Sequence, residues 1–375
     1  MGMSRLLLCT CLLLSALVGV ARADSPALTV PAPQLDASLA CHGDLAAGRP
    51  PVLLVPGTGE DPDFFATNYV PALQKLGLSS CTVTLPEHAT GDIQVAAEYV
   101  VAAIRTMHAR AGRRIDVIGH SQGGMVPRWG LKFFPDTREM VDDLVGLAAS
   151  NHGTSAARAV CVLSCNAATW QQRDDAKFIR ALNAGGETFA GISYTSVFTH
   201  NDEIVTPNAD AATGSTPLRS GNGARTNVAT QDICPTNTSE HLVLGSTDPV
   251  GYALAVDALT HDGPADPARI DRAVCLQIAQ PGVNPITGLG DTTAAFAKVG
   301  AQFAGGALLT SEPPLACYAG GPCGTTAGGG TTAGGGTTAG GGTTAGGGTT
   351  AGSGTTAGSG APGAKAHKPR LLVSA

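Results

Sequence analysis

The residues best suited to chemistry are residues 119–124, which read Gly-His-Ser-Gln-Gly-Gly. Small residues two positions before and two positions after a serine allow the sharp strand-to-helix turn that exposes a serine nucleophile. The flanking sequence agrees, since residues 115–118 are an apolar, strand-like run and residues 125–134 carry apolar residues at helical spacing. A chain with 50 glycines contains some such motifs by chance, but many of its glycines lie near the C-terminus. The context therefore predicts that Ser121 is a nucleophile.

A serine nucleophile needs a general base, and in serine hydrolases with this turn an acid and then a histidine follow the serine along the chain. Asp202 comes shortly after the strand-like residues 195–198, which makes it the candidate acid. Five histidines follow Ser121, but two come too early to follow such an acid and one lies in the C-terminal tail. Chain order alone therefore leaves His241 and His261 as candidates for the base.

An acyl-transfer site also needs N–H donors for the oxyanion of the tetrahedral intermediate. One donor is expected from Gln122, directly after the nucleophile, and another from the loop that follows an earlier strand. Residues 56–59, Pro-Gly-Thr-Gly, follow the apolar run 51–55, and Thr58 can add its hydroxyl group as a donor. An ordinary glycine-rich turn would have the same composition. Thr58 and Gln122 are thus the candidate oxyanion residues.

The segments that must position these residues alternate between strand-like and helix-like patterns. Alternation of this kind predicts parallel strands with crossover helices, hence an α/β three-layer sandwich with a mostly parallel central sheet. Such sheets carry their sites on loops beyond the carboxyl ends of the strands. The strand-like runs are 51–55, 81–85, 115–118, 144–149 and 194–198, and the helical patterns are 93–111 and 125–134.

The two ends of the chain differ from its middle. Residues 1–23 combine an early Arg5, an apolar run and a final Ala-Arg-Ala, which is typical of a secretory signal peptide. Residues 324–375 begin with repeated Gly-Thr-Thr-Ala-Gly units that offer no large side chain to bury, so a disordered tail is expected. We therefore predict one catalytic domain over residues 24–323, in a secreted, extracellular protein without a transmembrane segment.

Charge and cysteine content narrow the class further. The net charge is -6 and no dense run of lysine and arginine occurs, which argues against a nucleic-acid partner. Of the 10 cysteines, eight lie behind the predicted signal peptide, and an even number there predicts disulfides. No cysteine or histidine cluster has zinc spacing, so neither a metal nor a cofactor is expected. The sequence alone leaves the pairing of the cysteines open.

The chain resembles the Candida antarctica lipase B-like family of α/β-hydrolase lipases. The resemblance runs from about Leu35 to Cys275, and several of its motifs are not generic for hydrolases. The motifs are LVPGTG at 54–59, NYVP at 68–71, EYV at 98–100, SQGG at 121–124, WGL at 129–131, FFP at 133–135, WQQ at 170–172, NAGG at 183–186 and DEIV at 202–205.

The resemblance implies roles for individual residues. Ser121 matches the family's nucleophile and Asp202 its triad acid. His241 matches its triad base, which decides against His261 within this comparison. Thr58 and Gln122 match its oxyanion residues.

The resemblance also implies disulfides, namely Cys41 with Cys81 and Cys234 with Cys275, and a C-terminal bridge similar in kind to Cys317 with Cys323. The other two cysteines, 161 and 165, have no counterpart that could be placed. Two departures stand out. The residues before the nucleophile are Thr-Trp in the family's yeast enzyme and Gly119-His120 here, and residues 151–170 differ where a small lid would lie.

What the resemblance implies about function is a secreted serine ester hydrolase, either a triacylglycerol lipase or a carboxylesterase, that works through an acyl-enzyme on Ser121. Its partner would be a lipophilic ester, including esters at a lipid–water interface, and the protein would be a monomer. One alternative is a depolymerase for polyesters such as polyhydroxyalkanoate or cutin, because the same triad on an open surface cleaves polymeric esters. A more remote alternative is a non-catalytic binding protein with a hydrolase fold.

Overall fold

A central sheet organises the chain, seen here in a computed structural model that describes residues 24–284 and 286–323. Within these residues the sheet has seven strands in the order β1-β3-β2-β4-β5-β7-β8. β1 pairs with β3 antiparallel, and the other neighbours pair in parallel. The predicted α/β fold with a mostly parallel sheet is confirmed. The predicted signal peptide, 1–23, and the predicted tail, 324–375, lie outside the described residues.

The strands of the main sheet are β1 (Leu39–His42), β2 (Val52–Val55), β3 (Ser80–Val83), β4 (Ile115–His120), β5 (Val141–Leu147), β7 (Ser193–Phe198) and β8 (Ala224–Ala229). A separate antiparallel pair joins β6 (Cys165–Asn166) to β9 (Leu308–Leu309). β1 and β8 were not expected from the sequence. Both are edge strands, and their exposed or polar residues lack the continuous apolar pattern of the buried central strands.

The helices are α1 (Ala32–Ala37), α2 (Tyr69–Lys75), α3 (Ile93–Ala111), α4 (Gln122–Phe133), α5 (Ser155–Val160), α6 (Ala167–Gln171), α7 (Lys177–Asn183), α8 (Thr230–Ile233), α9 (His241–Ser246), α10 (Pro249–Thr260) and α11 (Gly288–Gly305). The predicted bounds of α3 hold at both ends. Asp92 caps its start by accepting a hydrogen bond from the N–H of Gln94, and Gly112 ends it with a φ of 65°.

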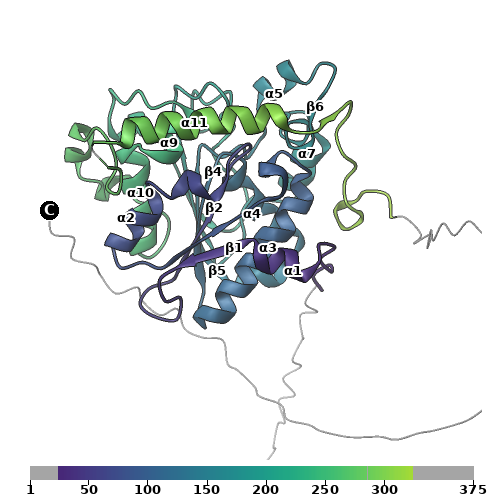
Figure 1. Cartoon of the computed structure of the whole chain (residues 1–375), viewed down its shortest axis with the longest axis horizontal. Helices are drawn as coiled ribbons and strands as arrows, with labels where there is room; N and C mark the ends of the chain where they lie inside the picture. Colours follow the sequence, from purple (N-terminus) through teal and green to yellow (C-terminus); the bar gives the residue numbers. More distant parts are fainter. Residues whose placement is uncertain (1–23, 285, 324–375) are drawn as a thin grey trace, which may run out of the picture.

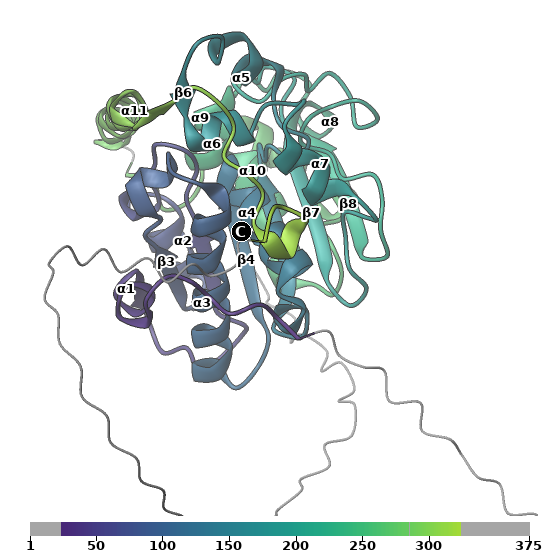
Figure 2. The same cartoon turned by 90° about the vertical axis from the view of Figure 1, so that its right-hand side faces the viewer.

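Helices cover both faces of the sheet and bury its apolar side chains. Side chains of β2 alternate, so that Leu53 and Val55 join a core with α3 and α4, whereas Val52 and Leu54 join a core with α2 and α10. α5, α9 and α11 gather at one end of the molecule (Figures 1 and 2), and α11 runs across the top of the view in Figure 1. None of the described helices is long and apolar enough to cross a membrane.

Four disulfides tie these elements together within the described residues. The Cys41–Cys81 bridge links the antiparallel neighbours β1 and β3, and Cys317–Cys323 closes a short loop near the end of the described chain. The Cys234–Cys275 bridge joins the end of α8 to a 3₁₀ turn at Arg272–Leu276. The fourth bridge, Cys161–Cys165, closes the short loop between α5 and β6.

Candidate active site

Ser121 occupies the turn between β4 and α4, where the backbone is strained. Its φ of 55° and ψ of -127° lie in a region that non-glycine residues rarely adopt, and such strain concentrates at functional sites. The turn is possible because strand and helix approach closely at glycines. A Cβ at Gly119 would lie 2.0 Å from the carbonyl oxygen of Gly123, and a Cβ at Gly123 would lie 2.1 Å from the carbonyl oxygen of Val55. Residues 119–124 thus form a tight strand-to-helix turn with Ser121 at its apex.

Asp202 and His241 are brought together from segments 39 residues apart. Asp202 follows β7, and its Oδ1 accepts hydrogen bonds from the N–H groups of Ile204 and Val205. His241 is the first residue of α9, and its Nδ1 lies 3.0 Å from Oδ1 and 3.1 Å from Oδ2 of Asp202. A hydrogen on Nδ1 held by the carboxylate leaves Nε2 free to accept a proton.

The surroundings of His241 set its affinity for a proton. Burial lowers the pKa of His241, but the Asp202 carboxylate, with weaker effects of Glu60 and Glu203, raises it by more, so the pKa lies above the ordinary value of 6.5. Glu203 also accepts a hydrogen bond from the backbone N–H of His241, with a distance of 3.3 Å. A buried histidine with a raised pKa between carboxylates suits a general base that must hold a proton during the reaction.

Thr58 and Gln122 lie next to each other beside the nucleophile. Gln122 begins α4, so its N–H has no partner within the helix and is available to an oxyanion. The hydroxyl of Thr58 donates to Oε1 of the Gln122 side chain, with 2.6 Å between the oxygens, and accepts from Nε2 of Gln172 at 2.8 Å. Gln172 was part of a motif noted in the sequence, but no role was predicted for it. Its hydrogen bond places Thr58 in this site.

A cavity of about 350 Å³ opens beside these residues, and both Ser121 and His241 line it. Most of its other lining is apolar and comes from α5, α11 and the loop after Asp202. The contribution of α11 to the cavity was not predicted from the sequence. Its signal was the spacing of Phe296, Val299 and Phe303, which are three and four residues apart and fall on one helical face.

The chain is also similar in sequence and structure to known proteins. The profile described as Alpha/beta hydrolase family matches residues 52–283. The chain belongs to the α/β-hydrolase family. It is 37% identical over 236 residues to Lipase B of Pseudozyma antarctica, an alignment that covers 60% of this chain and 67% of the relative. The crystal structure of lipase B from Aspergillus fumigatus matches with a TM-score of 0.73 and 30% identity, over 81% of this chain and 75% of the other. The predicted resemblance to lipase B-like hydrolases is confirmed.

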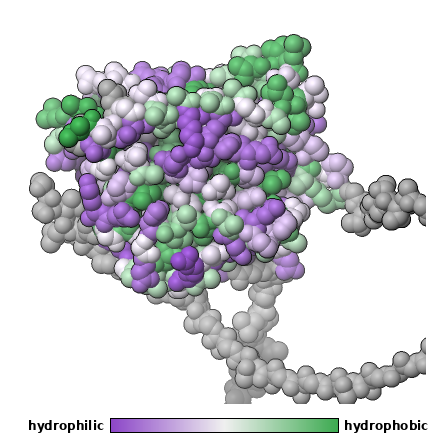
Figure 3. All heavy atoms as spheres, in the orientation of Figure 1, coloured by the Kyte–Doolittle hydropathy of each residue, from purple (hydrophilic) through white to green (hydrophobic). Residues whose placement is uncertain are grey.

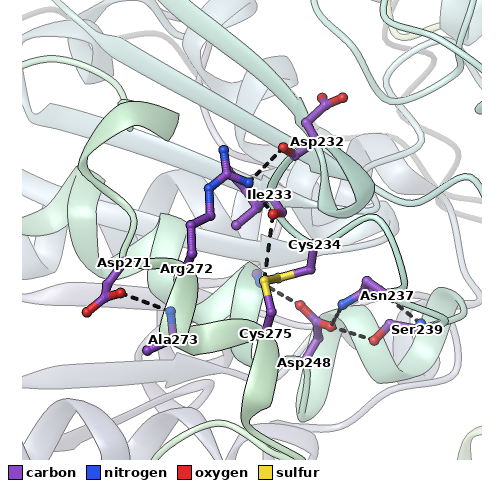
Figure 4. Close-up of a disulfide and its surroundings, with 11 residues drawn as sticks. Asp232, Ile233, Cys234, Asn237, Ser239, Asp248, Asp271, Arg272, Ala273 and Cys275 are labelled. Carbon is purple, nitrogen blue, oxygen red and sulfur yellow. Dashed lines mark hydrogen bonds between the residues drawn. A yellow bond between two sulfur atoms is a disulfide. The ribbon is translucent and has the colours of Figure 1, made fainter.

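The loop that leads into His241 of this hydrolase is tied to the fold at several points. Figure 4 shows the Cys234–Cys275 bridge beside Asp248, whose carboxylate accepts hydrogen bonds from the side chains of Asn237 and Ser239. The disulfide and Asp248 therefore anchor the residues that lead into His241.

The other histidine left open by chain order lies elsewhere in the hydrolase. His261 follows α10, its Nδ1 is 3.1 Å from Oδ1 of Asp257, and its side chain is 37% exposed. Of the two, only His241 is among the cavity-lining residues in the described part of the chain. Of these two histidines, His241 contacts Asp202 and lines the same cavity as Ser121, whereas His261 contacts Asp257.

Proposed function

We propose that this protein is a serine carboxylic-ester hydrolase of the lipase type, with Ser121 as nucleophile, His241 as general base and Asp202 as the acid that orients it. The observation that carries the proposal is the 3.0 Å contact of His241 Nδ1 with Asp202, next to a strained elbow serine in the same cavity. The relatives named lipase B support the same class of reaction.

Each step of the proposed reaction uses side chains or backbone N–H groups of this chain. His241 Nε2 takes the proton of Ser121 as the serine oxygen attacks the ester carbonyl, and Asp202 stabilises the imidazolium that forms. The N–H groups of Thr58 and Gln122 hold the oxyanion. His241 then passes the proton to the leaving alcohol, and a water molecule, deprotonated in the same way, hydrolyses the acyl-enzyme.

The substrate we propose is a lipophilic ester, presented at a lipid–water interface. The cavity walls supplied by Ala157, Val160, Val299 and Phe303 are apolar, so they favour an acyl chain over a charged group. Apolar side chains gather on the outside of the molecule where α5 lies in Figure 1, in the upper right of Figure 3. Four disulfides support action in an oxidising, extracellular environment.

Replacement of the nucleophile tests this proposal. Ser121→Ala should lower turnover of a soluble short-chain ester by a factor on the order of 10⁶, the loss seen when a triad serine is removed. His241→Ala should cause a comparable loss, whereas the matched variant His261→Ala should keep its activity. Rates are measured on a chain-length series of soluble esters, on emulsified triglyceride and on a polyester film. Substantial activity in Ser121→Ala would refute the assigned nucleophile, and a preference for the film would favour the depolymerase alternative.

A further inference from the structure

Directly behind the proposed base lies a second acid–histidine pair, Glu60 and His120. Both side chains are buried, and His120 Nδ1 lies 2.6 Å from Oε1 of Glu60. His120 immediately precedes the nucleophile, and its ring centre is 4.8 Å from that of His241. Neither Glu60 nor His120 takes part in a step of the proposed reaction. Burial of a carboxyl group and an imidazole is unfavourable unless both are fully hydrogen-bonded, so the partners of the pair indicate its purpose.

The second hydrogen bond of each side chain leads to a different part of the proposed site. Nε2 of His120 lies 3.0 Å from the backbone carbonyl oxygen of His241. Oε2 of Glu60 accepts the N–H of Gly57, at 2.5 Å, in the loop that presents Thr58. The pair therefore connects the backbone of the proposed base to the oxyanion loop, residues 56–59. His120 is in addition the direct neighbour of Ser121 in the chain.

Protonation of His120 follows from these neighbours. A backbone carbonyl can only accept, so Nε2 must carry a hydrogen to bond to His241. On the other side Nδ1 faces a carboxyl oxygen, and one proton must lie between them, on the ring or on Glu60. In either state the ring has a fixed orientation, because turning it over about the Cβ–Cγ bond would put carbon atoms in place of both nitrogens and break both hydrogen bonds.

Packing holds the ring in this plane. Phe64 stacks on its face with ring centres 5.1 Å apart and an interplanar angle of 7°. On the side of α9, a Cβ at Gly245 would lie 2.1 Å from Cδ2 of His120. A glycine at this position of the helix that His241 begins is thus required by the His120 ring.

We propose that Glu60 and His120 are positioning residues, which fix the positions of the His241 backbone and of the loop around Thr58 relative to Ser121. His120 acts through its hydrogen bond to the carbonyl of His241, and Glu60 through the hydrogen bond that it accepts from Gly57. The inference rests on the proposed function. It adds that the base is held from two sides, by Asp202 at its ring and by His120 at its backbone. A shift of about 1 Å at a reacting group can lower a rate about a hundredfold, so such a hold has kinetic consequences.

Two isosteric replacements of His120 separate its two hydrogen bonds. Glutamine places an N–H near the position of Nε2 and keeps the bond to the His241 carbonyl, while asparagine places one near Nδ1 and keeps only the bond to Glu60. Both remove the ring that stacks on Phe64. His120→Asn should lower kcat by about tenfold to a hundredfold with KM within about twofold, whereas His120→Gln should stay within about threefold of the parent kcat.

Two replacements of Glu60 supply the matched test. Glu60→Gln can accept the N–H of Gly57 with its oxygen and donate to Nδ1 of His120 with its amide, so every partner stays satisfied. Glu60→Leu keeps a similar volume but leaves the Gly57 N–H unpaired. We expect Glu60→Gln to keep kcat within about threefold and Glu60→Leu to lose about tenfold or more, with KM little changed in both.

The kinetics are measured on the full chain with a soluble ester, and kcat is expressed per serine that reacts with a phosphonate ester, so that misfolded protein does not count. Equal kcat in His120→Asn and His120→Gln, or losses confined to KM, would overturn the positioning role. His120→Asn or Glu60→Leu can fail to fold. In that case a loss of about tenfold or more in the kcat of both His120→Gln and Glu60→Gln overturns the positioning role as well. Ser121→Ala, assayed in parallel, reports on the proposed function separately: if that variant is active, the proposed function itself fails.

Discussion

At the scale of single residues, the candidate site depends on how carboxylates surround His241. Asp202 faces the Nδ1 side, Glu203 bonds to the backbone N–H, and Glu60 lies beyond His120. Burial alone would lower the pKa of His241, and the carboxylates reverse that effect. His241 therefore holds a proton more tightly than a free histidine, and this has a consequence for the pH dependence of the proposed reaction.

The pH profile of kcat/KM should show this raised pKa. Protonated His241 cannot accept the Ser121 proton, so activity rises as the pH passes upward through its pKa, and the midpoint of this acid limb should lie above 6.5. Glu203→Gln removes one of the charges that raise the pKa and should move the limb to lower pH. Asp36→Asn, an exposed change on α1, serves as the control and should leave the limb in place. A limb that moves to higher pH in Glu203→Gln would contradict this electrostatic account.

Thr58 offers a second test at the same scale. Thr58→Val removes the hydroxyl and keeps the side-chain shape, so we expect the barrier to rise by about 3 kcal/mol, the scale for one oxyanion donor. The hydroxyl donates to the Gln122 side chain in the present structure, and it must turn toward the substrate to act. Thr58→Ser retains the hydroxyl and should keep most of the activity. Steady-state kinetics check this, and a rise in KM at unchanged kcat would show a binding role instead.

At the scale of elements, α5 and the disulfide-closed loop after it, residues 161–165, form an apolar rim at the cavity. Val160 lines the cavity and is itself exposed, and beyond it Val162 and Leu163 are 74% and 83% exposed. These two lie inside the Cys161–Cys165 loop, which pairs through β6 with β9. The disulfide limits how far the loop can fold back, so its apolar side chains stay directed outward.

This rim should matter for aggregated substrate only. Burial of one leucine or valine side chain is worth about 1.5–3 kcal/mol, so the double change Val162→Ser with Leu163→Ser should weaken activity on emulsified triglyceride by about tenfold or more. Turnover of a soluble ester should be unchanged, because neither residue lines the cavity. Ile278→Ser, a fully exposed apolar residue outside the cavity lining, is the matched control. An equal loss on both substrates would show that the loop supports the site instead of the interface.

At the scale of the whole molecule, the proposed site lies within the residues predicted to form one domain. The sheet, its two cores and all residues of the candidate site fall between residues 24 and 323. The domain boundaries predicted from composition stay a prediction, because residues 1–23 and 324–375 are not among the described residues.

Truncation tests the predicted domain boundary. A chain that ends after Cys323 should keep the turnover of the full chain on a soluble ester and the same melting temperature, because the repeated Gly-Thr-Thr-Ala-Gly units offer no large side chain to bury. Activity on an emulsion or film is measured alongside, because the Lys365, Lys368 and Arg370 side chains can contact an anionic surface. A truncated protein that is unfolded or inactive on the soluble ester would place residues beyond 323 inside the domain.

The sequence by itself determined the local parts of this protein. The elbow at residues 119–124 is readable because glycine spacing and the flanking strand and helix are local properties. The bounds of α3 follow from its apolar period and its end signals, Asp92 and Gly112. Chain order narrowed the base to two histidines, and resemblance to the family selected one.

Only the tertiary structure decided which distant residues meet. Edge strands such as β8, the cavity wall formed by α11 and the buried Glu60–His120 pair carry no local signal of their proximity. Their contacts arise because crossover connections bring the carboxyl ends of parallel strands to one edge of the sheet, where segments far apart in sequence are packed together. A histidine beside the nucleophile is visible in the sequence, but its partners are set by burial, which leaves each polar atom only the hydrogen-bonding groups that the fold places beside it.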